Sequence, residues 1–174
     1  MDLLWQVPMA LGLLPLAWLV VTKRGAGAAW WWMAGAFAVS FVADVLTLVY
    51  DHRLVSQVYP VLQAGLFAAI LLPRKYAEWT IAVILVAASA SIAGRNADGF
   101  DVLMRVIAFG SVAGVAWMLP QSALRTSLLV YFAGGAVAWC GYVLAPGWTS
   151  WGLLQMARAV GIGCWCYAAK REAV

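Results

Sequence analysis

Residues 126–145, TSLLVYFAGGAVAWCGYVLA, indicate the fold class of this chain. The stretch contains no Asp, Glu, Lys, Arg or His. At about 1.5 Å per residue, a helix of this length covers roughly 30 Å, which is the thickness of the hydrocarbon core of a bilayer. The stretch is therefore typical of a transmembrane helix.

Six further runs of similar composition occur in the chain. Together the seven runs are 3–22, 28–50, 54–73, 77–94, 102–120, 126–145 and 149–169. The short breaks between them carry charges, Pro and Gly, which are typical of loops. We therefore expect an all-α integral membrane protein with seven transmembrane helices and no extramembrane domain.

The composition of the whole chain agrees with this fold class. Of the 174 residues, 66% are hydrophobic and 10% are charged. A soluble domain has about 45–50% apolar and about 25% charged residues. The composition therefore excludes a soluble globular domain, a disordered chain and a basic nucleic-acid-binding module.

The basic residues are sorted between the two sets of loops. One set holds most of them, namely Lys23, Arg24, Arg74, Lys75, Arg125, Lys170 and Arg171. The opposite set holds Arg53 and Arg95, with Asp51, Asp98 and Asp101 beside them. Since cytoplasmic loops are enriched in Lys and Arg, we expect the N-terminus outside and the C-terminus inside a bacterial inner or plasma membrane.

Spans 1–3 and spans 5–7 share an ordered set of dipeptides at near-constant spacing. The pairs are Ala17-Trp18 with Ala116-Trp117, Ala34-Gly35 with Ala133-Gly134, Val45-Leu46 with Val143-Leu144, and Leu62-Gln63 with Leu154-Gln155. They predict two parallel three-helix units, 1–76 and 97–174, joined by a linker helix within 77–96. Parallel repeats of this kind occur in transporters. Chance alignment of Ala-rich helices is the alternative.

Two segments of the second unit carry a family resemblance. Residues 109–121, FGSVAGVAWMLPQ, and the segment Trp139-Cys140-Gly141-Tyr142 resemble the first two helices of a PQ-loop superfamily repeat. That superfamily includes the SWEET sugar transporters, cystinosin-like transporters and the KDEL receptor. The first unit has Val21-Thr22 where Pro-Gln would be expected. The resemblance implies a 3+1+3 heptahelical fold and a carrier or receptor function.

The ionisable residues inside the expected spans are Asp44, Arg105 and Arg158. Charges within a membrane are costly and are candidate functional sites by default. Asp44, which shares a helix face with Ser40, and Arg158 lie at similar depth, roughly 10–14 Å below the outer surface by helix rise. We therefore expect them to meet. Arg105 is shallower and can pair with Asp101 one turn away.

Other polar side chains lie at a similar level. Tyr59 and Gln63 share a helix face, which Ser56 extends, and Gln155 stands one turn before Arg158. Gln63 and Gln155 occupy equivalent positions in the two units. We expect a polar cavity that opens outward, with a solute-binding set of Asp44, Tyr59, Gln63, Arg105, Gln155 and Arg158. The alternatives are a structural ion pair and ordinary interhelical hydrogen bonds.

Small and aromatic residues predict how the helices pack. Gly110 and Gly114 form a GxxxG pattern, which is typical of close contact between membrane helices. Four tryptophans lie deep in their spans, where we expect them to pack against other helices or to face a cavity: Trp18, Trp117, Trp139 and Trp165.

Other chemistries lack the residues they need. All three lysines lie at cytoplasmic ends of spans, so none can hold retinal as a Schiff base. The single histidine, His52, lies in a loop, which leaves no His-based metal cluster and no Ser–His pair inside a span. Cys164 and Cys166 point to nearly opposite faces of one helix. We expect no enzyme activity, no cofactor and no metal.

The function we predict is that of a small carrier. It would bind a small polar solute near the membrane midplane, between the two three-helix units, and expose it alternately to the two sides. A non-transporting receptor or an accessory subunit of a larger membrane complex is the alternative. The expected partners are the lipid bilayer, the solute, and a second copy or another membrane protein, but no nucleic acid.

Overall fold

The computed structural model describes residues 10–22, 26–50, 53–73, 76, 79, 82–83, 85–87, 89–90, 100–145 and 147–172. The regular secondary structure of these residues is all helical, which confirms the expected all-α class for this part of the chain. The elements are η1 (Leu11–Leu13), α2 (Leu14–Thr22), α3 (Ala28–Tyr50), α4 (Arg53–Leu71), α6 (Phe100–Trp117), α7 (Ala123–Leu144) and α8 (Trp148–Glu172).

The helix boundaries follow the breaks expected from the sequence. The run 28–50 coincides with α3, and the last three runs differ from α6, α7 and α8 by a few residues at their ends. The first run continues as η1 and α2, while its residues 3–9 lie outside the described residues. The run 77–94 is described only in part, and its described residues are helical.

Local sequence explains where α7 begins. Pro120 stands between α6 and α7, where its ring cannot continue a helix. The Ser122 hydroxyl then accepts a hydrogen bond from the Arg125 N–H at 3.1 Å, which caps the first turn of α7. The Ala123 N–H donates to Glu172 Oε1 at 2.9 Å. The end of α8 is thereby joined to the start of α7.

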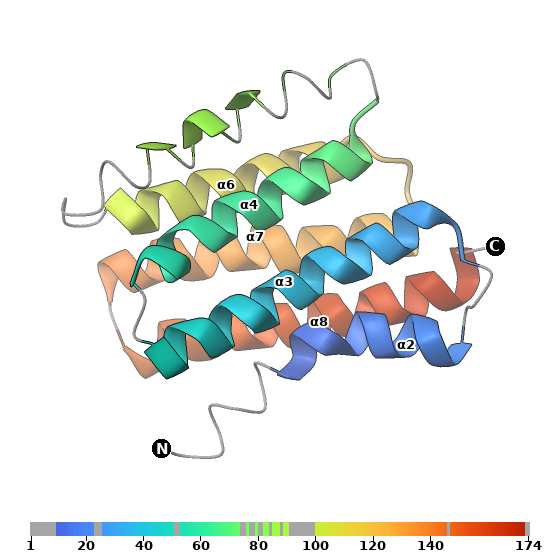
Figure 1. Cartoon of the computed structure of the whole chain (residues 1–174), viewed down its shortest axis with the longest axis horizontal. Helices are drawn as coiled ribbons and strands as arrows, with labels where there is room; N and C mark the ends of the chain where they lie inside the picture. Colours follow the sequence, from blue (N-terminus) through green and yellow to red (C-terminus); the bar gives the residue numbers. More distant parts are fainter. Residues whose placement is uncertain are drawn as a thin grey trace.

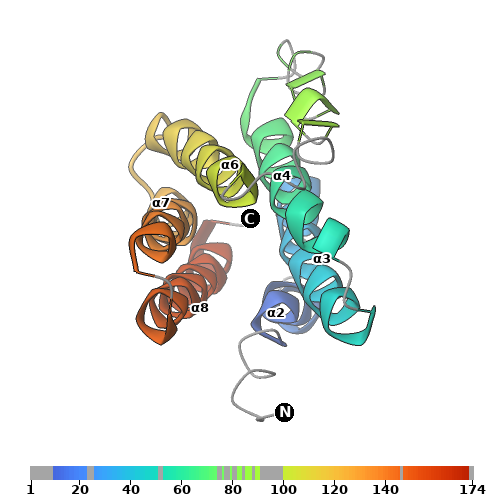
Figure 2. The ribbon, with the colours of Figure 1, turned by 90° about the vertical axis from the view of Figure 1, so that its left-hand side faces the viewer.

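The six described α-helices form a closed ring when viewed along their axes (Figure 2). One arc contains α2, α3 and α4, and the other contains α6, α7 and α8. The arcs meet where α4 packs on α6 and where α2 packs on α8. Helices α2 and α6 run in the same direction along the bundle (Figure 1). This order is compatible with two parallel three-helix units, which remain a prediction.

Aromatic rings fill the centre of this ring of helices. Phe37 of α3 lies 4.9 Å from Phe67 of α4 and 5.0 Å from Tyr131 of α7, measured between ring centroids. It also lies 5.8 Å from Trp165 of α8. We call Phe37, Phe67, Phe109, Tyr131, Phe132 and Trp165 the aromatic layer. Because its contacts join α3 and α4 to α7 and α8, this layer holds the two arcs together.

Glycines allow close packing within the second arc. A Cβ built on Gly161 of α8 would lie 2.6 Å from Tyr131 Cβ, and one on Gly134 of α7 would lie 2.8 Å from Ala157 Cβ. The close contact expected at Gly110 and Gly114 is not found, since no described atom lies within 4 Å of a Cβ built on either residue. Both glycines lie on the exposed side of α6. The contact predicted from the GxxxG pattern is therefore wrong for the described helices.

The outer surface of the bundle is strongly apolar. Two helical stretches among the described residues, Ala28–Leu46 and Ala123–Leu144, are long and apolar enough to cross a membrane. Only 33% of each stretch is buried inside the bundle. Large side chains such as Trp32, Val137 and Leu144 are exposed. The other described helices are shorter apolar segments or fail this test, so the count of seven spans remains a prediction.

Candidate functional site

Asp44 and Arg158 form an ion pair between the two arcs. Arg158 Nη1 donates to Asp44 Oδ2 at 2.7 Å, which joins α8 to α3. The side chains are 16% exposed for Asp44 and 10% exposed for Arg158. The contact predicted from their equal depth is present. Since the pair is largely desolvated, removing either partner would leave a buried charge.

Ser40 extends the ion pair into a chain of hydrogen bonds. Arg158 Nη2 donates to Ser40 Oγ at 2.9 Å, and Ser40 Oγ donates to the Phe37 carbonyl at 2.7 Å. Ser40 lies one turn before Asp44, so both face α8 from the same side of α3. Arg158 therefore contacts two residues of α3 through its two terminal nitrogens, an arrangement that fits the forked geometry of a guanidinium.

Gln63 lies one turn after Tyr59 on α4 and is fully buried. Its Nε2 donates to the Ala36 carbonyl at 3.2 Å and to the Tyr131 hydroxyl at 3.4 Å. Tyr131 was not among the site residues expected from the sequence. Its position in the sequence could have identified it, since Tyr131 is a tyrosine within an otherwise apolar span. A buried tyrosine hydroxyl usually forms a hydrogen bond.

Arg105 is buried and stacks on an aromatic ring. Its guanidinium carbon lies 4.3 Å from the centre of the Trp139 ring of α7, a cation–π contact. The side chain of Asp101, its expected partner, lies outside the described residues. Trp139 was expected to pack against a helix or to face a cavity, and its contact with Arg105 was not predicted.

Tyr59 is half-buried on α4, one turn before Gln63. The structure places Asp44 and Arg158 in direct contact and buries the side chains of Gln63 and Arg105 within the bundle. Gln155 is partly buried on α8, one turn before Arg158. The side chain of Ser56 lies outside the described residues. We call Ser40, Asp44, Tyr59, Gln63, Arg105 and Arg158 the polar layer.

Several buried polar atoms in or beside the polar layer have no hydrogen-bond partner among the described residues. Gln63 Oε1, Gln155 Oε1 and Arg158 Nε are among them. An unsatisfied buried polar atom costs about 1–3 kcal/mol. The atoms include both acceptors and a donor, so a bound polar molecule could satisfy them.

The described residues contain no group of three His, Cys, Asp or Glu side chains that could hold a metal ion. A cavity of about 820 Å³ lies between α4 and α6, and none of the six expected site residues lines it. No family model, no curated protein and no solved structure matches the chain. The resemblance to the PQ-loop superfamily therefore remains a prediction.

Proposed function

We propose that the chain is an integral membrane protein with seven spans, its N-terminus outside and its C-terminus in the cytoplasm. The apolar outer surface supports a membrane location, because a helix in the core of a soluble protein would be mostly buried. Side chains exposed by 69% at Val137 and 85% at Leu144 would face water in a soluble protein. The sorting of basic residues between loops supports the orientation.

We propose further that it is a carrier for a small polar solute. The observation that carries this proposal is the Asp44–Arg158 ion pair, which joins the two arcs of the bundle and lies among buried polar atoms without partners. Structural ion pairs are normally satisfied by their surroundings. Here Arg158 retains an unpartnered Nε, and the amide oxygens of Gln63 and Gln155 are available to accept hydrogen bonds.

The geometry suggests how binding and movement are coupled. A carboxylate or phosphate on the solute would compete with Asp44 for Arg158, because a guanidinium binds such groups through two parallel hydrogen bonds. An amine would compete with Arg158 for Asp44. Either group would loosen the link between α3 and α8 and allow one arc to rock against the other.

The aromatic layer provides the closed side of such a carrier. Phe37 lies two turns further along α3 from Asp44 toward the expected cytoplasmic end, and Trp165 lies two turns beyond Arg158 on α8. Closely packed rings at this level separate the polar layer from the cytoplasmic end. We therefore assign this conformation to a state that is closed toward the cytoplasm.

A thermal-shift screen of the purified protein in detergent tests the proposal. Small carboxylates, phosphates, amines and sugars are added in turn, and a ligand that binds the folded state raises the unfolding temperature. We expect at least one class of solute to stabilise the wild type but not the Arg158→Lys variant. Lysine keeps the positive charge but lacks the two terminal nitrogens of the guanidinium. Ser127→Ala is the matched control, because Ser127 is a fully buried α7 residue that donates to the Gly161 carbonyl outside the polar layer.

The double variant Asp44→Asn/Arg158→Gln separates this function from a purely structural ion pair. It removes both charges, so no unpaired buried charge is left. If the double variant is folded and still responds to the same solute as the wild type, the site assignment is wrong. Solutes that pass the screen are then tested for uptake into proteoliposomes, and binding without uptake would refute a carrier.

A non-transporting receptor or accessory subunit is the second candidate. The packing of Phe37 against three rings from α4, α7 and α8 favours it, because such a core resists the movement that a carrier needs. Copurification with one stoichiometric membrane protein would support the accessory role.

A further inference from the structure

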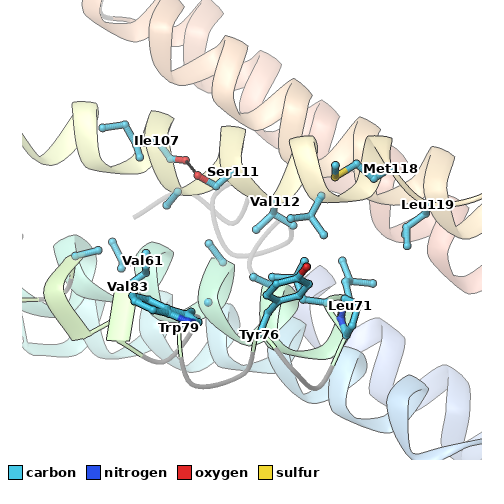
Figure 3. Close-up of a pocket in the computed structure, with 18 of the residues that line it drawn as sticks. Val61, Leu71, Tyr76, Trp79, Val83, Ile107, Ser111, Val112, Met118 and Leu119 are labelled. Atoms are coloured by element: carbon cyan, nitrogen blue, oxygen red, sulfur yellow. Dashed lines mark hydrogen bonds between the residues drawn. The ribbon is translucent and has the colours of Figure 1, made fainter.

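The cavity of about 820 Å³ lies along the junction where α4 meets α6 (Figure 3). Val61 and Leu71 mark its extent along α4, while Ile107 lines it from α6 and Leu119 from the segment just after α6. Trp79 and Val83 come from the partly described segment between these helices. We call this space the lateral cavity, because it lies between α4, α6 and the segment that joins them, and no residue of the polar layer lines it.

The described lining of the lateral cavity is almost entirely apolar. None of its described residues carries a charge. The Ser111 hydroxyl donates to the Ile107 carbonyl of its own helix at 2.7 Å, so it has no second proton to donate to a ligand. A bound water needs two to four polar partners, and large apolar cavities therefore stay dry or take apolar ligands. The lining favours a hydrocarbon over a polar solute.

The lateral cavity is elongated along the helix axes. On α6 its lining runs from Met104 to Val115, which is roughly 16 Å at the rise of an α-helix. On α4 it runs from Val61 to Leu71, roughly 15 Å. The hydrocarbon of one bilayer leaflet is about 15 Å thick, half of the whole core. A straight hydrocarbon chain that lies along the membrane normal matches this shape.

Small residues on α4 create the space. Ala64, Gly65 and Ala68 follow Val61 at helical spacing and line the cavity. Beside them Leu62 and Leu66 are exposed on the outer surface of α4. In a membrane, this surface would contact lipid, so a lipid chain could enter sideways without crossing a polar region.

We propose that the lateral cavity binds one acyl chain of a membrane lipid. The inference rests on the membrane location proposed above but not on solute transport. A chain that arrives from the bilayer gains nothing from the hydrophobic effect, so its binding depends on van der Waals contact with the lining. Occupancy is therefore saturable and sensitive to the space available between α4 and α6.

Photolabelling tests this proposal. The protein is reconstituted in vesicles that contain a phospholipid with a diazirine on one acyl chain, and the labelled peptides are mapped by mass spectrometry. We expect label on the peptides that contain Ala68 and Val115, and we expect excess unlabelled phospholipid to remove it. Ala68→Leu and Val115→Phe each fill part of the cavity and should each lose this label.

Leu153→Phe is the matched control, because Leu153 is half-exposed on α8 and does not line the cavity. It should retain the label at α4 and α6. Uniform labelling of all exposed helices, or labelling that no folded filling variant reduces, would overturn the proposal. If the α4 and α6 peptides stay unlabelled and a second protein is found bound over them, the cavity is a docking site for that protein and not for a lipid chain. This result would also overturn the proposal. Failure of the vesicles to incorporate the protein would refute the membrane location and not only the acyl-chain site.

Discussion

Gly161→Ala is the substitution whose effect follows most directly from the packing of the second arc. The added Cβ would lie 2.6 Å from Tyr131 Cβ and 2.9 Å from both Tyr131 Cα and its backbone nitrogen. Carbon atoms prefer separations of about 3.5–4.0 Å, so α7 and α8 would have to move apart by about 1 Å. The contacted atoms are backbone and Cβ, which cannot turn aside as the end of a flexible side chain can.

The expected cost is at the upper end of that for overpacking, about 3 kcal/mol. For a chain of this size, such a loss lowers the unfolding temperature by about 6–12 °C. The assay is thermal unfolding in detergent, followed by tryptophan fluorescence. Gly163→Ala is the control on the same helix, because no described atom lies within 4 Å of its built Cβ. We expect no loss of stability there. Equal unfolding temperatures for the two variants would refute the close contact between α7 and α8.

Three further predictions concern the ion pair, the aromatic layer and the topology. Arg158→Ala should lower the free energy of unfolding by about 3–5 kcal/mol, because Asp44 is left buried without a partner. The double variant Asp44→Asn/Arg158→Gln should recover much of that loss in the same unfolding assay. Phe37→Ala should lower the free energy of unfolding by about 3–5 kcal/mol, because it leaves a cavity among the aromatic rings. Val137→Ala, at an exposed position, should change the free energy of unfolding by less than roughly 0.5 kcal/mol. A reporter fused after Val174 should give a cytoplasmic signal, and a signal from the outer side would contradict the proposed orientation.

The sequence predicted the helices well because apolar runs and their breaks are local features. The run 28–50 matches α3 at both ends, and Pro120 stands at the predicted end of the run before α7. The closed ring of helices was not predicted, because hydropathy does not record which helices are neighbours. The GxxxG pattern of Gly110 and Gly114 indicated a close contact that the structure places elsewhere, at Gly134 and Gly161.

The candidate site was predicted in part. Asp44 and Arg158 could be paired by counting residues from the span ends, since helix rise converts sequence position into depth. Tyr131 and Trp139 could not be paired with Gln63 and Arg105 in this way, because those contacts depend on how each helix is rotated about its axis. The lateral cavity could not be predicted either, since it arises between helices that are far apart in sequence.

We propose that the polar layer opens to one side of the membrane at a time. It can be tested with Ser40→Cys in a variant whose own cysteines, Cys140, Cys164 and Cys166, are replaced by Ala. A membrane-impermeant thiol reagent is added to right-side-out and to inside-out vesicles. The control is Ser127→Cys, which lies fully buried between α7 and α8 and should not react from either side. We expect the cysteine at position 40 to react from both sides and a bound solute to slow both reactions. A folded protein in which this cysteine reacts from neither side would contradict alternating access to the polar layer.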